Sequence, residues 1–184
     1  MRVQTLTSLA LIAVGLVAAG GGWLFRDRSR TLLASAAAAT TLALLGVLAA
    51  SRPELGNGTP GWSVLWVVAL GLLAVGGGGP VTTAVFSLVD GSHEADEDSV
   101  RSAGAVLRGG AWIGALERAA VYGTLVAGWP EGVALVLGLK GLGRYPELRN
   151  QEHTGTAERF IIGTFTSVLW AVGCAAVAHL LRGA

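Results

Sequence analysis

Glu117 and Arg118 stand side by side in an otherwise apolar stretch, GALERAAVY, which runs from Gly114 to Tyr122. Successive residues of an α-helix project about 100° apart, so the two charges face different directions and each needs a partner of its own. Lys140 lies in the next apolar stretch along the chain. An acid and two bases placed among apolar segments can bind an anionic group, carry protons or hold helices together.

More charges stand near the ends of the neighbouring apolar segments. We expect Glu117 to pair with Lys140 or Arg144, and Arg118 to reach Glu158 or a bound anion, because the three segments bring opposite charges to the same side. The expected binding cluster consists of Glu117, Arg118, Lys140, Arg144, Glu147, Glu158 and Arg159. We expect no catalytic residue, no metal site and no cofactor.

The composition decides the class of protein. With 52% hydrophobic residues, 14% charged residues, 28 glycines and a mean hydropathy of +0.60, the chain cannot hide its apolar surface in a small soluble core. A membrane-spanning helix needs about 20 mostly apolar residues. We therefore predict an all-α fold, a polytopic integral membrane helix bundle with about six hydrophobic segments. These segments are 3–25, which we expect to be an uncleaved span, 31–50, 62–89, 111–128, 130–143 and 160–181.

The third segment contains the helix breakers GGGGP at 76–80, and two interpretations stay open. In the favoured one, the helix ends near Val75 and residues 81–89 lie along the membrane interface. In the other, one span is broken inside the membrane and its backbone groups line a site, as in transporters. The fifth segment, 130–143, is also expected to be short or broken.

The arginines in alternate loops predict the orientation, since cytoplasmic loops carry the excess of Lys and Arg. Eight arginines fall on one side and three on the other. Both termini are therefore expected outside a bacterial cell membrane, with loops 26–30, 90–110 and 144–159 in the cytoplasm. The polar loop 90–110 would separate a three-segment membrane half, 1–89, from a second half, 111–184, that carries the charge cluster.

Small residues recur at every fourth position in the fourth and sixth segments, a pattern that lets helix backbones approach closely in lipid. We expect these two helices to pack through the small residues, although an alanine- and glycine-rich composition alone gives the same pattern. The residues of this expected contact are Gly110, Gly114, Ala115, Ala119, Gly123, Gly163, Ser167 and Ala171. The single cysteine, Cys174, is expected to pack as a small core residue.

The charge balance argues against nucleic-acid binding, because a net charge of +1 gives no electrostatic footprint for DNA or RNA. The acidic stretch DGSHEADEDSVRS from Asp90 offers carboxylates and a histidine to a divalent metal, but a solvated loop is the favoured interpretation. Asp90-Gly91 also begins like the signature of CDP-alcohol phosphotransferases, whose later aspartates are missing here.

Four pieces of the C-terminal part resemble a known family: IGALER at 113–118, Lys140 with Gly141, GRYPEL at 143–148 and AERFIIGT at 157–164. Residues 110–184, which contain these pieces, are similar to the C-terminal half of bacterial membrane proteins grouped as a domain of unknown function, DUF3307. The whole chain is similar to small actinobacterial integral membrane proteins. The resemblance implies no activity and indicates only that the charged residues lie in the recognisable part.

Three kinds of function follow from these features. The favoured one is a transporter or channel-like protein, or an accessory membrane subunit, that binds an anionic group or a lipid headgroup at its cytoplasmic face. A purely structural assembly protein is the second, and an intramembrane enzyme acting on lipid or polyprenyl phosphates is the third. The expected partners are membrane lipids and a homo-oligomer or larger membrane complex.

Overall fold

The computed structural model describes residues 13–15, 17, 28–51, 60–89, 110–149 and 156–182. All of them are helical except for a short turn at 127–130, so the all-α prediction is confirmed for this part of the chain. The predicted first segment, 3–25, and the acidic loop 90–110 lie almost wholly outside the described residues. The helices are α2 (Arg28–Ser51), α3 (Pro60–Val89), α5 (Gly110–Val126), α6 (Glu131–Arg149) and α7 (Thr156–Arg182).

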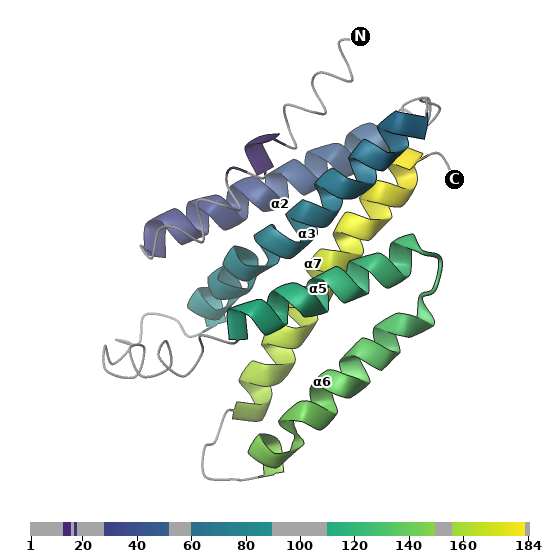
Figure 1. The fold of residues 1–184 in the computed structure, drawn as a ribbon. Helices are drawn as coiled ribbons and strands as arrows, with labels where there is room; N and C mark the ends of the chain where they lie inside the picture. The colour runs from purple at the N-terminus through teal and green to yellow at the C-terminus, as the bar shows by residue number, and fades with distance from the viewer. Residues whose placement is uncertain are drawn as a thin grey trace.

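Helix α3 is the centre of the bundle. It packs against α2, α5 and α7, and its most extensive contact is with α7 (Figure 1). α6 lies at the edge, where it packs mainly on α5 (Figure 1). The two predicted halves of the chain therefore form one bundle, because α3 from the first half lies between helices of the second.

Contacts between the helices show that helices successive in the chain alternate in direction. Arg118 of α5 contacts Val75 of α3, whereas Tyr122, one turn further along α5, contacts Val67. α5 and α3 are therefore antiparallel. α5 and α6 are also antiparallel, because they are joined by the turn at 127–130.

The core consists of apolar residues from α2, α3, α5 and α7. Trp66 and Leu70 of α3 and Cys174 of α7 are almost fully buried, which confirms the expectation that the single cysteine packs in the core. The largest contributors are Leu45, Trp66, Leu70, Leu73, Tyr122, Trp170 and Leu181.

The glycine run at 76–79 neither ends α3 nor breaks it, so both interpretations made from the sequence are wrong. α3 continues through the glycines and Pro80 to Val89, a length of 30 residues. Each glycine in a helix interior costs about 1 kcal/mol relative to alanine. Packing offsets this cost, because Gly77 and Gly78 leave room for the Trp170 ring and the Arg118 side chain.

Helix α6 is longer than predicted and unbroken. It runs to Arg149, with Pro146 inside its last turns, so residues 144–149 belong to the helix and not to the expected loop 144–159. The helix thus extends six residues beyond the predicted end at Gly143, through a proline that removes one backbone hydrogen bond and crowds the carbonyl of Leu142.

The small residues of α5 and α7 have different surroundings. In α7, Ser167 and Ala171 are buried and Gly163 lies against Phe86 of α3, so this row is a packing surface, largely toward α3. In α5, Ala119 and Gly123 are exposed and only Ala115 of the predicted row is buried. The predicted contact between two small rows is therefore wrong for α5, whose buried face consists of Ala115, Arg118, Val121 and Tyr122.

Because Ala115 is buried and Ala119 is exposed, larger side chains at these two positions of α5 should affect stability differently. We expect Ala115→Leu to destabilise the bundle by about 1–3 kcal/mol, because the added atoms overpack a buried position. Ala119→Leu is the matched control, and it should change the free energy of unfolding by less than about 0.5 kcal/mol because Ala119 is exposed. Thermal unfolding of the purified protein in detergent measures both. Equal tolerance at the two positions would contradict the described packing of α5.

Two of the described helices are long and apolar enough to cross a bilayer. They are Ser63–Val89 and Ala157–Arg182, with mean hydropathies of 2.0 and 1.9. α2 contains a shorter apolar stretch, Leu32–Leu48. α5 and α6 do not pass the same test, so two of the predicted spans are supported by length and composition.

Candidate functional site

The turn between α5 and α6 fixes how these two helices face each other. Gly128 has a φ of 76°, and it follows the end of α5 after one intervening residue, Ala127. Its N–H donates to the carbonyl of Leu125, and the N–H of Trp129 donates to Thr124, which together form a Schellman cap. α6 then returns antiparallel to α5. Residues at equal distances from this turn, such as Glu117 and Lys140, are therefore brought opposite each other.

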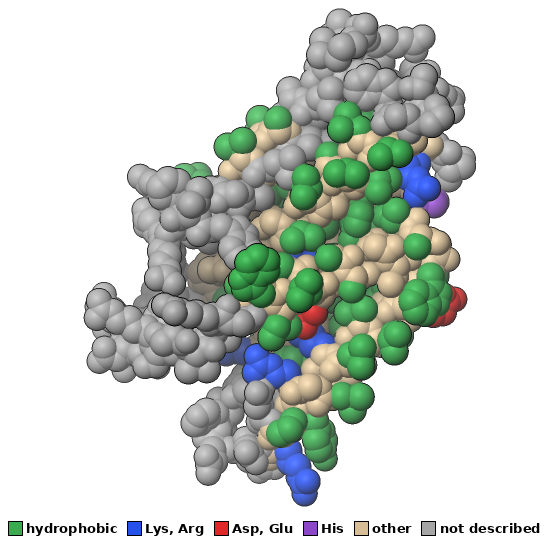
Figure 2. Space-filling model, in the orientation of Figure 1, with side chains coloured by type: hydrophobic (Ala, Val, Ile, Leu, Met, Phe, Trp, Pro, Cys, Tyr) green, Lys and Arg blue, Asp and Glu red, His purple; other side chains and the backbone are tan. Residues whose placement is uncertain are grey.

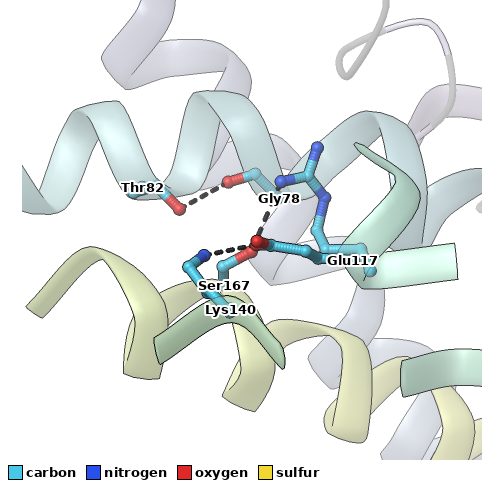
Figure 3. A network of polar contacts seen from close by, with 6 residues as sticks. Gly78, Thr82, Glu117, Lys140 and Ser167 are labelled. Atoms are coloured by element: carbon cyan, nitrogen blue, oxygen red, sulfur yellow. Dashed lines mark hydrogen bonds and ion pairs between the residues drawn. The ribbon is translucent and has the colours of Figure 1, made fainter. Parts of the chain in front are cut away.

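Glu117 and Lys140 form an ion pair between α5 and α6 (Figure 3). Their side chains keep exposed fractions of 17% and 20%, so the pair is only partly shielded. Lys140 Nζ also lies 5.8 Å from the centroid of the Phe160 ring on α7, a distance at which a cation–π attraction contributes. The expectation that Glu117 pairs with Lys140 or Arg144 is confirmed for Lys140.

Arg118 turns the other way and is buried, with an exposed fraction of 5%. Its Nε and Nη2 donate to the carbonyl oxygen of Val75 on α3, over 3.0 and 2.8 Å. Its Nη1 donates to the Ser167 hydroxyl oxygen on α7 over 3.3 Å (Figure 3). The expected contact with Glu158 is wrong, because Glu158 is exposed and the guanidinium is held by neutral acceptors. We call Glu117, Arg118, Lys140, Ser167 and the Val75 carbonyl the charged junction.

Glycines in α3 make these contacts possible. Gly78 carries no Cβ, and one placed there would meet Arg118 Nε at 2.6 Å and Trp170 Cδ1 at 3.1 Å. Trp170 uses the same open surface, where its Nε1 donates to the carbonyl of Leu73 over 3.2 Å. Tyr122 adds a third such contact, donating to Val67 over 2.7 Å. Side chains from α5 and α7 thus bind backbone oxygens of α3 at successive levels.

The charged junction lies near mid-height of the two apolar helices. Val75 is within about two residues of the middle of Ser63–Val89, which is ~3 Å along the axis. Ser167 is within about three residues of the middle of Ala157–Arg182. The guanidinium of Arg118 therefore lies near the middle of these helices, and not at the end of the bundle, where binding at the cytoplasmic face was expected.

The charges at the junction do not balance. Glu117 and Lys140 neutralise each other, whereas Arg118 is bound by a carbonyl and a hydroxyl. Glu117 also attracts Arg118 electrostatically, but one carboxylate is then shared by two cations. Three of the five guanidinium N–H groups donate to protein atoms within the described residues. The junction therefore carries one excess positive charge and spare donors.

A small cavity opens at this place. Its volume is about 10 Å³, which is room for roughly one water molecule. Polar side chains from α5, α6 and α7 line part of the cavity, and aliphatic side chains line the rest. The lining residues are Glu117, Arg118, Val121, Val136, Leu137, Lys140, Ser167 and Val168.

Three other residues of the expected cluster, Arg144, Glu158 and Arg159, are described and do not line the cavity at the junction. Arg144 is exposed one turn beyond Lys140 on α6, and Glu158 is exposed in the first turn of α7. The guanidinium of Arg159 lies 5.9 Å from the Phe86 ring of α3. The side chain of Glu147 lies outside the described residues. Of the predicted seven-residue cluster, the contacts of the described residues bring together Glu117, Arg118 and Lys140.

Sequence reasoning missed two polar features of the site. Ser167 was expected only as a small packing residue, yet its oxygen accepts the hydrogen bond from Arg118. Thr164, one turn before Val168 on α7, buries a hydroxyl for which the described part of the chain offers no hydrogen-bond partner. The spacing of Thr164, Ser167 and Val168 places all three on one side of α7, which was the available signal.

No cluster of three metal-ligating side chains occurs among the described residues. The acidic stretch that begins at Asp90 lies outside them.

Comparison with known proteins adds no family to this description: no protein-family model, no curated protein and no solved structure matches the chain. The resemblance of residues 110–184 to the DUF3307 proteins therefore stays a prediction.

Proposed function

We propose that this chain is a small multi-pass protein of a bacterial cell membrane whose charged junction binds an anionic group inside the helix bundle. Such a protein would act as a transporter or channel-like component, or as an accessory subunit of a larger membrane complex. The observation that carries the proposal is the burial of Arg118 with only neutral acceptors, beside a Glu117–Lys140 pair that is already balanced. A buried cation without its own counter-ion is costly, and a bound anion removes that cost.

The surface of the bundle supports a membrane location. Large hydrophobic side chains are exposed on α5 and α6, including Trp112, Leu116, Leu139 and Leu142. Figure 2 shows hydrophobic side chains spread over this face, with acidic and basic side chains meeting near its middle. Lipid tails would cover such a face, as would a second copy or another membrane subunit. α3 and α7 would be full spans, and α5, with 17 residues, would cross about 25 Å of a bilayer.

The proposed orientation follows from the alternating helix directions. Arg28 at the start of α2, Arg149 at the end of α6 and Arg159 at the start of α7 come to one end of the bundle. That end would face the cytoplasm, because basic residues concentrate there. The protein would then have both termini outside.

Single cysteines test this orientation in intact cells, after Cys174 has been replaced. We expect cysteines at Ser29, Ser92 and Asn150 to resist an impermeant thiol reagent and to react after the cells are permeabilised, because all three would face the cytoplasm. Labelling of the Asn150 cysteine from outside would overturn the proposed arrangement of the C-terminal helices.

A purely structural role is the second candidate, and the Glu117–Lys140 pair favours it. This pair joins α5 to α6, and the contacts of Arg118 join α5 to α3 and α7. In that case the charges would lock the helices and no anion would be needed.

An anion-depletion experiment separates the two candidates. Purified protein in detergent is dialysed into a buffer whose only anion is a bulky sulfonate, and its thermal midpoint is measured before and after adding chloride, phosphate or phosphatidylglycerol. We expect at least one anion to raise the midpoint of the natural protein and none to raise that of Arg118→Gln. Identical thermal midpoints under all conditions would contradict anion binding and would favour the structural role.

A further inference from the structure

We infer that the anion taken up by the charged junction is a single monatomic ion of the halide class, seated between Arg118, Ser167 and Lys140. This inference rests on the proposed function, since it names the ligand of the same site. It follows from the size of the cavity, the donors that face it and the nature of its remaining walls.

The size of the cavity decides against polyatomic anions. The cavity, with a volume of about 10 Å³, has room for roughly one water-sized sphere, whereas a phosphate, a sulfate or a lipid phosphate group carries four oxygens around its central atom. A larger site would require separating α5 from α6 or α7. That movement would break the Glu117–Lys140 pair or the Arg118–Ser167 hydrogen bond. A monatomic ion needs neither change.

The hydrogen-bond donors at the cavity suit a spherical anion, which accepts hydrogen bonds from any direction. Arg118 has two N–H groups beyond the three that bind Val75 and Ser167. Ser167 accepts from Arg118, so its own hydroxyl hydrogen is left to donate. Lys140 has three N–H groups, and its ion pair with Glu117 does not occupy all of them. These side chains come from α5, α6 and α7 and all line the cavity, and Figure 3 shows Lys140 beside Ser167.

The remaining walls are aliphatic side chains, namely Val121, Val136, Leu137 and Val168. Such walls offer nothing to a strongly hydrated or multivalent anion, which would lose its water without replacement. A singly charged halide needs less compensation, and one negative charge balances the single excess positive charge of the junction.

Glu117 sets the affinity, because it is the negative group on the wall. Lys140 holds its carboxylate, but repulsion between Glu117 and a bound anion remains. Removing this charge would leave Arg118 and Lys140 facing the ion together. Glu117→Gln should therefore bind a halide more tightly than the natural protein does, even though the variant loses an ion pair.

The test measures the thermal midpoint of the purified full-length protein in detergent, in gluconate buffer of constant ionic strength. Chloride or bromide should raise the midpoint along a saturable curve, whereas sulfate and phosphate should not. Arg118→Gln should abolish the effect. Ser167→Ala, which removes one donor, should raise the half-saturating chloride concentration several-fold, and Glu117→Gln should lower it several-fold. Arg149→Gln, which removes an exposed arginine outside the junction, is the matched control and should behave as the natural protein does.

The outcomes distinguish this inference from the proposed function. Stabilisation by phosphate, sulfate or phosphatidylglycerol that depends on Arg118, without a halide effect, would overturn the inference and leave anion binding in place. A halide effect that survives both Arg118→Gln and Ser167→Ala would mean surface binding and would also overturn it. If no anion raises the thermal midpoint, both the halide inference and the proposed anion-binding function are wrong. If Arg118→Gln does not fold, the opposite shifts expected for Ser167→Ala and Glu117→Gln still decide the question.

Discussion

Replacing Gly78 by alanine is expected to destabilise the protein by about 2–3 kcal/mol, although alanine is the better helix former. The new Cβ would meet Arg118 Nε at 2.6 Å and Trp170 Cδ1 at 3.1 Å. Arg118 cannot simply retreat, because its guanidinium is fixed by hydrogen bonds to Val75 and Ser167. The substitution must therefore displace the guanidinium from the junction or push α5 away from α3.

Gly123→Ala and Gly138→Ala are matched controls for this substitution. Both glycines lie inside helices, α5 and α6, and a Cβ at either position would have no atom within 4 Å. Each change should stabilise the protein by about 0.5–1 kcal/mol, which is the usual gain in helix propensity. Thermal unfolding in detergent compares all three variants. A stabilising Gly78→Ala would contradict the close approach of Arg118 to α3.

The second large effect is expected at the Glu117–Lys140 pair. Exposed ion pairs contribute about 0–1 kcal/mol, and breaking a buried one costs about 3–5 kcal/mol. The pair here is only partly exposed, so we expect Glu117→Gln and Lys140→Gln to cost roughly 1–3 kcal/mol each. Glu117→Gln should cost more, because it leaves two cations at the charged junction, Lys140 and Arg118, without a carboxylate.

A double-mutant cycle on unfolding free energies in detergent isolates the interaction. The double variant should lose less than the sum of the single losses, since the second substitution removes a charge that the first has left unpaired. Lys140→Gln combined with Arg149→Gln is the control pair, and its losses should add. Additive losses for Glu117 and Lys140 would make the two residues independent and contradict the observed pairing.

The Glu117–Lys140 pair was predictable from the sequence because its geometry depends on a local signal. Gly128 and Pro130 mark a tight turn, and two antiparallel helices joined by such a turn bring equidistant residues together. Glu117 and Lys140 are nearly equidistant from Gly128. The positions of α2, α3, α5 and α7 were predictable for a similar reason, since long apolar runs separated by polar residues define them.

The partner of Arg118 was not predictable, because a backbone carbonyl leaves no mark in the sequence. Charge alone points Arg118 to Glu158 or to a bound anion, but Glu158 is exposed at the start of α7. The marker was present in the glycines at 76–79, which were interpreted as helix breakers. Glycine lowers helix propensity, but in a buried helix it also admits a neighbouring side chain, and the sequence alone does not show which effect dominates.

The small residues of α5 show a different limit. Ala119 and Gly123 follow the same fourfold spacing as Ala115, yet they are exposed. Which face of a helix is buried depends on all of its packing contacts. In α5, the hydrogen bonds of Arg118 and Tyr122 to α3 determine the buried face. Small-residue spacing therefore gave the correct face for α7 and the wrong one for α5.

Anomalous scattering from crystals soaked in bromide is the sharpest test of halide binding at the charged junction, because it locates the ion without relying on stability. We expect one strong peak within hydrogen-bonding distance of the Arg118 guanidinium and the Ser167 hydroxyl, and its loss in Ser167→Ala or Arg118→Gln crystals. No peak at the charged junction under saturating bromide, with peaks confined to exposed arginines such as Arg149, would contradict it.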